Sequence, residues 1–224
     1  MSSNNPRTIA ILGGTGKEGK GLAFRWAQAG HSIIIGSRTS DKALAAVEEV
    51  KALIAKPVTI TGKDNNTAAR EAEIVVLTVP YAFHKEMLEA IKTDVQGKLF
   101  IDVTVPIVPP KVTRVQMPPE GSASQQAQLI LGENVRVVAA FQNISYENLL
   151  SSNSVDCDVL VAGGDKDARG QVVSLVRDAG LMGIDAGPID NAVVIEGLTS
   201  ILIGINKQFG VEASGIRITG IPRE

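Results

Sequence analysis

The chain has 224 residues, with 22 basic against 24 acidic side chains for a formal net charge of −2, and 44% of its residues are hydrophobic. This length and apolar content suffice for a globular chain with a sizeable core. The near balance of charge lacks the electrostatic footprint of a nucleic-acid-binding protein. The single cysteine, Cys157, excludes an internal disulfide and a cysteine-rich metal site, and its apolar neighbours predict a buried thiol.

The N-terminal residues are polar and lack the apolar core of a signal peptide. We expect that no apolar run approaches the roughly 18 residues that a membrane span requires. We therefore expect a cytoplasmic protein with no nucleic-acid partner and no membrane partner.

Residues 8–12 form an apolar run that ends in a cluster of glycines. Gly14, Gly16 and Gly19 fit the pattern G-x-G-x-x-G of dinucleotide-binding domains. In that pattern the glycines serve a tight turn, close approach of the backbone to a pyrophosphate, and close packing of helix on strand. The N–H groups that begin the following helix would face the anion. Alone, the pattern is a weak signal, and the alternative is a glycine-rich turn that only joins a strand to a helix.

Apolar strands and amphipathic helices alternate after this turn. Strands are predicted at 8–12, 31–36, 58–61, 73–80, 98–106 and 135–140, and helices at 17–29, 40–55, 64–72, 83–93 and 122–131. The fourth and fifth strands are almost continuously apolar, which is typical of strands buried on both faces of a parallel sheet. The fold class predicted is therefore α/β, a Rossmann-type doubly wound parallel sheet. Trp26, Leu44, Val47 and Leu53 are expected to face inward.

The sequence changes character in its last third. Residues 106–121 are rich in proline, which favours either a binding or lid segment or a solvated crossover loop. Beyond residue 142 we expect a strand at 155–164, a helix at 166–179, a long apolar helix at 190–209 and an edge strand at 215–220. We predict an NADP-binding Rossmann domain over residues 1–141. A small C-terminal domain over residues 142–224 would cover the carboxyl edge of the sheet, where ligands of open α/β folds bind.

The end of the second strand indicates which dinucleotide is bound. NAD-binding versions of the fold carry an acidic residue there to hold the ribose hydroxyls. This chain has Ser37 and Arg38 instead, and Lys42 follows one helical turn later. A hydroxyl and two cations suit a 2′-phosphate, so we expect NADP(H). The alternative is an ordinary solvated helix start.

Other motifs in the first half predict no catalytic side chain. The segment from Gly14 to Lys20 satisfies G-x-x-x-x-G-K, but Gly21 follows where a P-loop needs a hydroxyl for magnesium. His84 is interpreted as an ordinary helix residue, with general acid as the alternative, and Asp102 is expected to bond neighbouring backbone. Hydride transfer between two cofactors needs only their alignment and the exclusion of water.

Over essentially its whole length the chain resembles the NADPH-dependent F420 reductases, the F420H2:NADP oxidoreductases. The segments that carry the resemblance are Ile11 to Ala23, Gly30-His31, Gly36-Ser37-Arg38 with Lys42-Ala43, Leu77 to Pro80, Pro118 to Ala123, Val137 to Phe141, and Asp185 to Ile189. The glycine pattern is shared by many folds. The combination is more specific: the glycine pattern is followed, in this order along the chain, by Gly-Ser-Arg, Pro-Pro-Glu-Gly-Ser and Asp-Ala-Gly-Pro.

The resemblance implies that a hydride passes directly between C4 of NADPH and C5 of the deazaflavin coenzyme F420, without metal. Matched by position, the residues that would bind NADP are Gly14, Thr15, Gly16, Lys17, Glu18, Gly19, Ser37, Arg38 and Lys42. Val79 and Val105 would flank the nicotinamide, while Ala140, Gln142 and Asn143 would lie at the deazaflavin. The long C-terminal helix would contribute to a homodimer, although a buried core helix explains the same apolar face.

One position departs from the family pattern. Many members have histidine after Ala-Ala-Phe, whereas this chain has Gln142, which donates and accepts hydrogen bonds but carries no proton charge. An NADPH-dependent reductase of flavins or ferric ions, which the resemblance to the STEAP ferric reductases also implies, is therefore an alternative. A non-catalytic NADP(H)-binding redox sensor is another.

Overall fold

The structure is a computed structural model that describes residues 6–150 and 155–223. Its strands are β1 Thr8–Leu12, β2 Ser32–Ser37, β3 Ile60–Asp64, β4 Ile74–Leu77, β5 Leu99–Asp102, β6 Arg136–Ala139, β7 Asp158–Gly163 and β8 Met182–Asp185. Its helices are α1 Lys17–Ala29, α2 Ser40–Ala52, α3 Asn65–Glu71, η1 Tyr81–Phe83, α4 His84–Ile91, α5 Ala123–Leu131, α6 Tyr146–Leu149, α7 Lys166–Asp178, η2 Ile189–Asn191 and α8 Ala192–Phe209.

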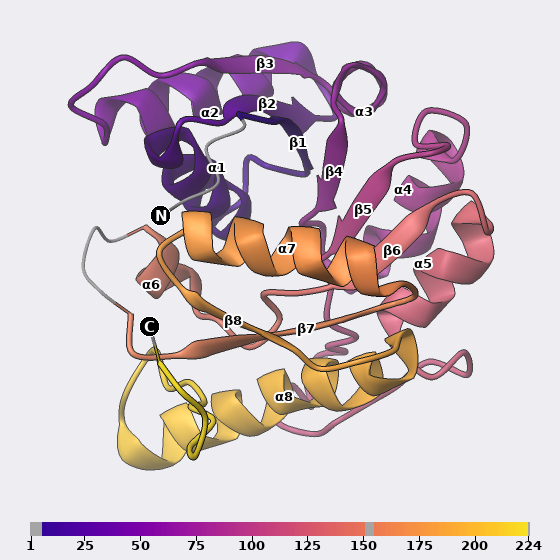
Figure 1. Cartoon of the computed structure of the whole chain (residues 1–224), viewed down its shortest axis with the longest axis vertical. Helices are drawn as coiled ribbons and strands as arrows, with labels where there is room; N and C mark the ends of the chain where they lie inside the picture. Colours follow the sequence, from indigo (N-terminus) through magenta and orange to yellow (C-terminus); the bar gives the residue numbers. More distant parts are fainter. Residues whose placement is uncertain (1–5, 151–154, 224) are drawn as a thin grey trace.

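All eight strands form one sheet in the order β3-β2-β1-β4-β5-β6-β7-β8, with helices on both faces (Figure 1). Neighbouring strands from β3 to β6 are parallel. The strand order reverses between β1 and β4, which is where the carboxyl ends of a doubly wound sheet open a ligand-binding crevice. The α/β Rossmann-type fold class is confirmed.

Two apolar clusters, one on each face of the sheet, form the core. Trp26 is fully buried in the first, with its ring edge-on to Phe141 at 5.6 Å between centroids and its Nε1 donating to the Leu175 carbonyl at 2.8 Å. The expected burial of Trp26, Val47 and Cys157 is confirmed.

Leu44 of α2 and Leu53, the C-cap of this helix, contradict the prediction that they face inward. Leu44 is 51% exposed and Leu53 is 53% exposed. The helix instead packs through Ala43, Ala46, Val47 and Val50. At Ala43 its backbone lies so close to β3 that a Cβ on Gly62 would stand 2.7 Å from the Ala43 carbonyl carbon. Leu44 and Leu53 lie outside this buried face.

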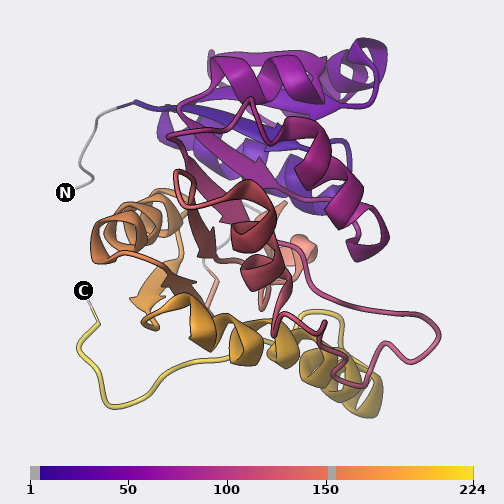
Figure 2. The ribbon, with the colours of Figure 1, turned by 90° about the vertical axis from the view of Figure 1, so that its right-hand side faces the viewer.

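The sheet continues across the predicted boundary between the two domains. β7 pairs antiparallel with β6 through Val138↔Gly163 and Ala139↔Ala162, and β8 is parallel to β7. The helix α8 and the C-terminal tail lie along the far side of these strands (Figures 1 and 2). The division at residues 141 and 142 stays a prediction, with hydrogen-bonded strands on both sides of it.

The edge strand expected at 215–220 is not formed. The tail does meet the start of β7, since Asp158 N donates to the Ile216 carbonyl at 2.8 Å. Ile218 N then donates to the carboxylate of Asp158 at 2.6 Å rather than to a main-chain carbonyl, which ends the ladder. The structure also contains two elements that the sequence did not predict, β8 and α6, each four residues long.

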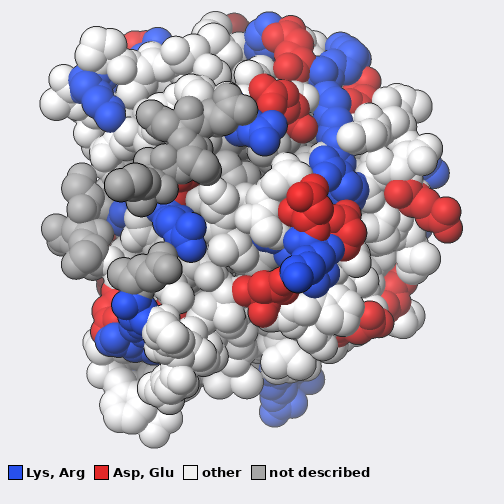
Figure 3. All heavy atoms as spheres, in the orientation of Figure 1, with Lys and Arg blue, Asp and Glu red and all other residues white. Residues whose placement is uncertain are grey.

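The segment Ile189–Phe209 is a helix long and apolar enough to cross a membrane by length and composition, so the expectation that no apolar run approaches that length was wrong. A single such helix is a weak indication of a membrane span. Ile195, Glu196 and Leu202 on this helix are buried against the rest of the protein. On the face shown in Figure 3, acidic and basic side chains are mixed rather than segregated.

Candidate cofactor site

Two glycines of the fingerprint are required by the fold itself. A Cβ on Gly14 would stand 2.6 Å from the Ile11 carbonyl oxygen, and one on Gly19 would stand 2.5 Å from the Gly14 Cα. Both distances are far below van der Waals contact. These positions therefore serve the tight turn and the close packing of α1 on β1, as the pattern predicts.

The middle glycine, Gly16, has no such reason within the protein. It is exposed, its φ of −73° is open to any residue, and the nearest atom to a Cβ there would be the Gly13 carbonyl oxygen at 3.8 Å. Gly16 is also the N-cap of α1 and supplies no side-chain cap to the free N–H groups of the first turn. An open approach and uncapped donors fit a bound pyrophosphate.

Gly21, which excludes a P-loop, is explained by packing. A Cβ on Gly21 would stand 2.6 Å from the Leu149 Cβ of α6. The same short helix is fastened to α1 by Lys17 Nζ, which donates to the Tyr146 hydroxyl at 3.0 Å, and by Arg25, which donates to the Leu149 carbonyl at 3.0 Å. α6 therefore lies beside the start of α1, next to the glycine-rich turn.

The residues predicted to select NADP lie at the end of β2 and the start of α2. Gly14 N donates to the Gly36 carbonyl at 3.0 Å, which joins the phosphate-binding turn directly to this strand end. Ser37 is buried, whereas Arg38 and Lys42 are exposed. Within residues 6–150 and 155–223 neither cation has an ion-pair partner, so both are available to a phosphate.

Glu18, also predicted to bind NADP, is held in an unusual state. Its Oε1 atom is buried and has no hydrogen-bond partner among the described residues. Burial raises the pKa of this carboxyl group from 4.5 to about 8. A neutral acid at this place removes the repulsion that an ionised carboxylate would exert on phosphates in the turn.

The residues expected at the nicotinamide follow the central strands. Val79 comes after β4 and Val105 after β5, and both are half-buried. A Cβ on Gly13 would stand 2.6 Å from Val79 Cγ1, so the glycine turn and Val79 are in contact. Thr104 Oγ1 donates to the Val79 carbonyl at 3.5 Å and joins the two strand ends.

The residues expected at the deazaflavin follow β6, and all are buried. Gln142 Nε2 donates to the Asp102 carbonyl at 2.7 Å, and Asn143 Nδ2 donates to the Asp158 carbonyl at 2.6 Å. Their amide oxygens are left buried without partners among the described residues, and Phe141 between Ala140 and Gln142 has a φ of +74°. Unsatisfied acceptors and a strained backbone favour a functional role for this turn.

A buried cluster behind these residues was not predicted. His84 Nε2 lies 2.7 Å from Asp102 Oδ2, and both side chains are fully buried, so His84 is no ordinary helix residue. Asp102 also accepts from Thr104 N at 3.0 Å, which confirms its expected bond to neighbouring backbone. Glu196 of α8 accepts from Ala123 N and Ser124 N at the start of α5. A charged residue inside an apolar strand was the available signal for Asp102.

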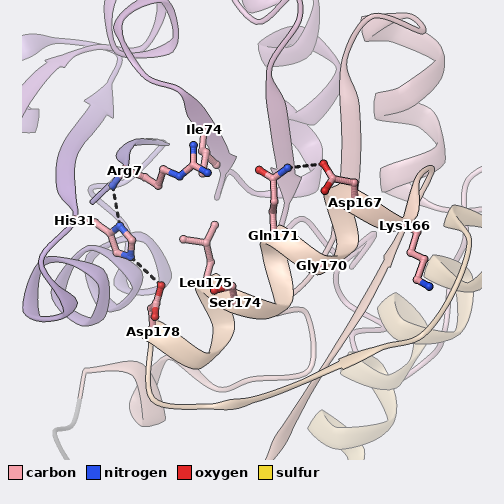
Figure 4. Close-up of a pocket in the computed structure, with 10 residues that line it drawn as sticks. All are labelled: Arg7, His31, Ile74, Lys166, Asp167, Gly170, Gln171, Ser174, Leu175 and Asp178. Atoms are coloured by element: carbon pink, nitrogen blue, oxygen red, sulfur yellow. Dashed lines mark hydrogen bonds and ion pairs between the residues drawn. The ribbon is translucent and has the colours of Figure 1, made fainter. Parts of the chain in front are cut away.

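A groove of about 650 Å³ lies elsewhere, at the amino ends of the strands beside α7 (Figure 4). Within it His31 Nε2 pairs with Asp178 at 3.2 Å, and Arg7 N donates to His31 Nδ1 at 3.1 Å. None of the predicted cofactor residues lines this groove. The predicted residues meet instead at the carboxyl edge, through the contacts among the ends of β1, β2, β4, β5 and β6.

Comparison with known proteins agrees with this arrangement. Residues 8–106, from β1 to just beyond β5, match the family model described as NADP oxidoreductase coenzyme F420-dependent. The solved structure of a protein from Arthrobacter sp. FB24 superposes with a TM-score of 0.80 at 23% identity, covering 96% of this chain and 100% of that one. At that identity the likeness shows the fold.

Two relatives of known name match along nearly the whole chain. The F420-dependent NADP reductase of Methanocaldococcus jannaschii is 38% identical over 221 residues, which cover 95% of this chain and 98% of that protein. The F420-dependent NADP reductase of Methanothermobacter thermautotrophicus is 41% identical over 223 residues, which cover 96% of each. The chain therefore belongs to the family of F420-dependent NADP reductases.

Proposed function

We propose that this protein transfers a hydride directly between NADP(H) and coenzyme F420. The observation that carries the proposal is the near-complete alignment with two F420-dependent NADP reductases, which includes both the phosphate-binding turn and the residues after β6. When bound, the two ring systems supply the hydride donor and acceptor, and the protein need supply no metal.

The chain's own residues would hold the NADP end of the site at the carboxyl edge of β1 and β2. Gly16 leaves the backbone open to the pyrophosphate, with Thr15, Lys17 and the neutral Glu18 around it. The exposed Arg38 would neutralise the 2′-phosphate, supported by the Ser37 hydroxyl and by Lys42 one turn into α2. This part of the proposal makes NADP(H) the preferred nucleotide over NAD(H).

The walls of the reacting region would be apolar on one side and amide-lined on the other. Val79 and Val105 would exclude water from the nicotinamide. Ala140, Gln142 and Asn143 would orient the deazaflavin, and the two amide groups are already fixed by main-chain carbonyls. Orientation of this kind lowers the barrier without an acid or base at the reacting carbons.

The test is to mix the purified protein with NADPH and F420 and to follow the visible absorbance of oxidised F420. We expect the absorbance to bleach with NADPH and to bleach far more slowly with NADH. The same preparation is then assayed with FMN, FAD and ferric chelates. Turnover of those acceptors without turnover of F420 would favour a flavin or ferric reductase, and tight NADPH binding without any turnover would favour a redox sensor.

We propose further that the protein works as a cytoplasmic homodimer in which α8 forms the contact. Val194, Ile201 and Phe209 on this helix are 63%, 49% and 68% exposed, an unusual amount for large apolar side chains. The C-terminal unit of residues 142–224 would thus have two roles, at the cofactors and at the partner. Light scattering should give a mass twice that of the monomer, and the Val194→Asp variant should have the mass of a monomer.

A further inference from the structure

His84 occupies a buried position where both ring nitrogens face hydrogen-bond acceptors. It is the first residue of α4 and is 0% exposed. Nε2 lies 2.7 Å from Asp102 Oδ2 on β5, and Nδ1 lies 3.2 Å from Gln126 Oε1 on α5. A neutral imidazole can donate from only one nitrogen.

The orientation of Gln126 decides the protonation state of His84. Gln126 Nε2 donates to Glu120 Oε2 at 3.3 Å, so its Oε1 must face the histidine. Both nitrogens of His84 then donate, which requires the imidazolium. Burial opposes this charge, but the charge of Asp102 and the hydrogen bonds that His84 donates to Asp102 and Gln126 raise the pKa of His84 above its ordinary value.

The ion pair of His84 and Asp102 is connected by hydrogen bonds to the residues predicted to form the walls of the cofactor site. The main-chain carbonyl of Asp102 accepts from Gln142 Nε2 at 2.7 Å, and its Oδ1 accepts from Thr104 N at 3.0 Å. Thr104 precedes Val105 in the chain. Asp102 therefore joins the predicted deazaflavin wall to the predicted nicotinamide wall, and His84 holds its remaining carboxylate oxygen.

We propose that His84 is a positioning residue for the second substrate, F420: its charged ring fixes Asp102, and through Asp102 it fixes the side chain of Gln142. The inference rests on the proposed function, because it assigns F420 to the wall that Gln142 forms. It adds a residue that contacts neither cofactor and lies one layer behind the site.

The groups around His84 give the direction of its pH dependence. Those that face it are Asp102 on β5, Glu196 on α8, Glu120 beyond Gln126 and Tyr81 on η1, whose ring stacks at 5.9 Å. These acids favour the cation. Loss of the proton leaves Nδ1 opposite an amide oxygen, and rotation of that amide would turn its oxygen toward Glu120. Rising pH therefore loosens the cluster, and binding of F420 should weaken.

The test compares His84→Gln with the parent protein over about pH 6 to about pH 9. We expect the KM for F420 to rise about tenfold in His84→Gln, with the KM for NADPH unchanged. In the parent, the KM for F420 should rise with pH in step with the deprotonation of His84, and this dependence should vanish in the variant. His31→Gln is the matched control, since His31 is the only other histidine, is buried, and pairs with Asp178 away from the site.

NMR titration of the imidazole signals of the parent measures the protonation state of His84 without any turnover. Each signal is assigned to His84 or His31 by its absence in the corresponding variant. A neutral His84 at about pH 7 would overturn the proposal, as would equal changes in both KM values or a KM for F420 no higher than in His31→Gln. If His84→Gln does not fold, Gln126→Leu should lower the pKa of His84 and raise the KM for F420. Absence of any F420 turnover by the parent would instead refute the proposed function, while the NMR titration still reports on His84.

Discussion

The glycine fingerprint can be separated into a folding part and a binding part by two alanine substitutions. In Gly19→Ala the new methyl group would stand 2.5 Å from the Gly14 Cα and 2.9 Å from Thr78 Oγ1. Backbone must move to relieve this overlap, which costs about 1–3 kcal/mol of the free energy of unfolding. The gain of about 0.5–1 kcal/mol from replacing a helical glycine offsets part of it.

In Gly16→Ala the methyl group meets no atom of the described residues closer than 3.8 Å. The free energy of unfolding should therefore change by no more than about 1 kcal/mol, the scale of an N-cap exchange. The methyl group does enter the approach to the pyrophosphate. Steric overlap with the pyrophosphate there should cost about 1–3 kcal/mol of binding free energy, which raises the Kd for NADPH roughly 5- to 150-fold.

Thermal unfolding and NADPH titration of both variants test this separation. Gly170→Ala is the control, because Gly170 lies within α7 and no atom in the described part of the chain lies within 4 Å of its Cβ position. Neither the stability nor the NADPH affinity of this variant should fall. The reasoning is refuted if Gly16→Ala binds NADPH within about twofold of the parent. It is also refuted if the Gly16 and Gly19 variants lose the same stability.

Three further outcomes are expected. Arg38→Ala should weaken NADPH binding by about 1.5–3 kcal/mol and leave NADH binding unchanged. The control is Lys51→Ala, at the other end of α2. Equal effects of Arg38→Ala on both nucleotides in titrations would contradict a contact with the 2′-phosphate. Because the pKa of Glu18 rises from 4.5 to about 8 on folding, the folded state retains a proton that the unfolded chain releases, so stability should fall between those pH values. Glu18→Gln should remove that slope in melting curves, and an unchanged slope would exclude the assignment. Arg223→Ala removes the guanidinium that donates to both carboxylate oxygens of the buried Asp158 at 2.8 Å. Because the unpaired carboxylate is charged at neutral pH but not in acid, the melting temperature should drop at neutral pH but not in acid.

Much of the NADP half could be predicted because its signals are local. The turn at Gly14, the periodicity around Trp26 and the exchange of an acid for Arg38 each depend on residues that are neighbours in the chain. The parallel sheet followed from continuous apolar strands, which only burial on both faces explains.

The errors arise where distant segments decide the outcome. Leu44 and Leu53 fit a helical period, but the buried face of α2 is formed by Ala43, Ala46, Val47 and Val50, which the packing of distant segments selects. The tail alternates like a strand, but the carboxylate of Asp158 takes the place of the next ladder acceptor. His84 could not be paired from the sequence, because its partner lies 18 residues away on another element.

The pairing of β7 with β6 has a consequence for how ligands come and go. Many enzymes with two units on either side of a cleft open by a hinge, and the distance between their halves varies during turnover. Here the units share one sheet, so a hinge between residues 141 and 142 would have to break ladder bonds at Val138 and Ala139. In the proposed site, the spacing between the wall of Val79 and Val105 and the wall of Ala140, Gln142 and Asn143 would thus be set by the sheet and would not change through a hinge.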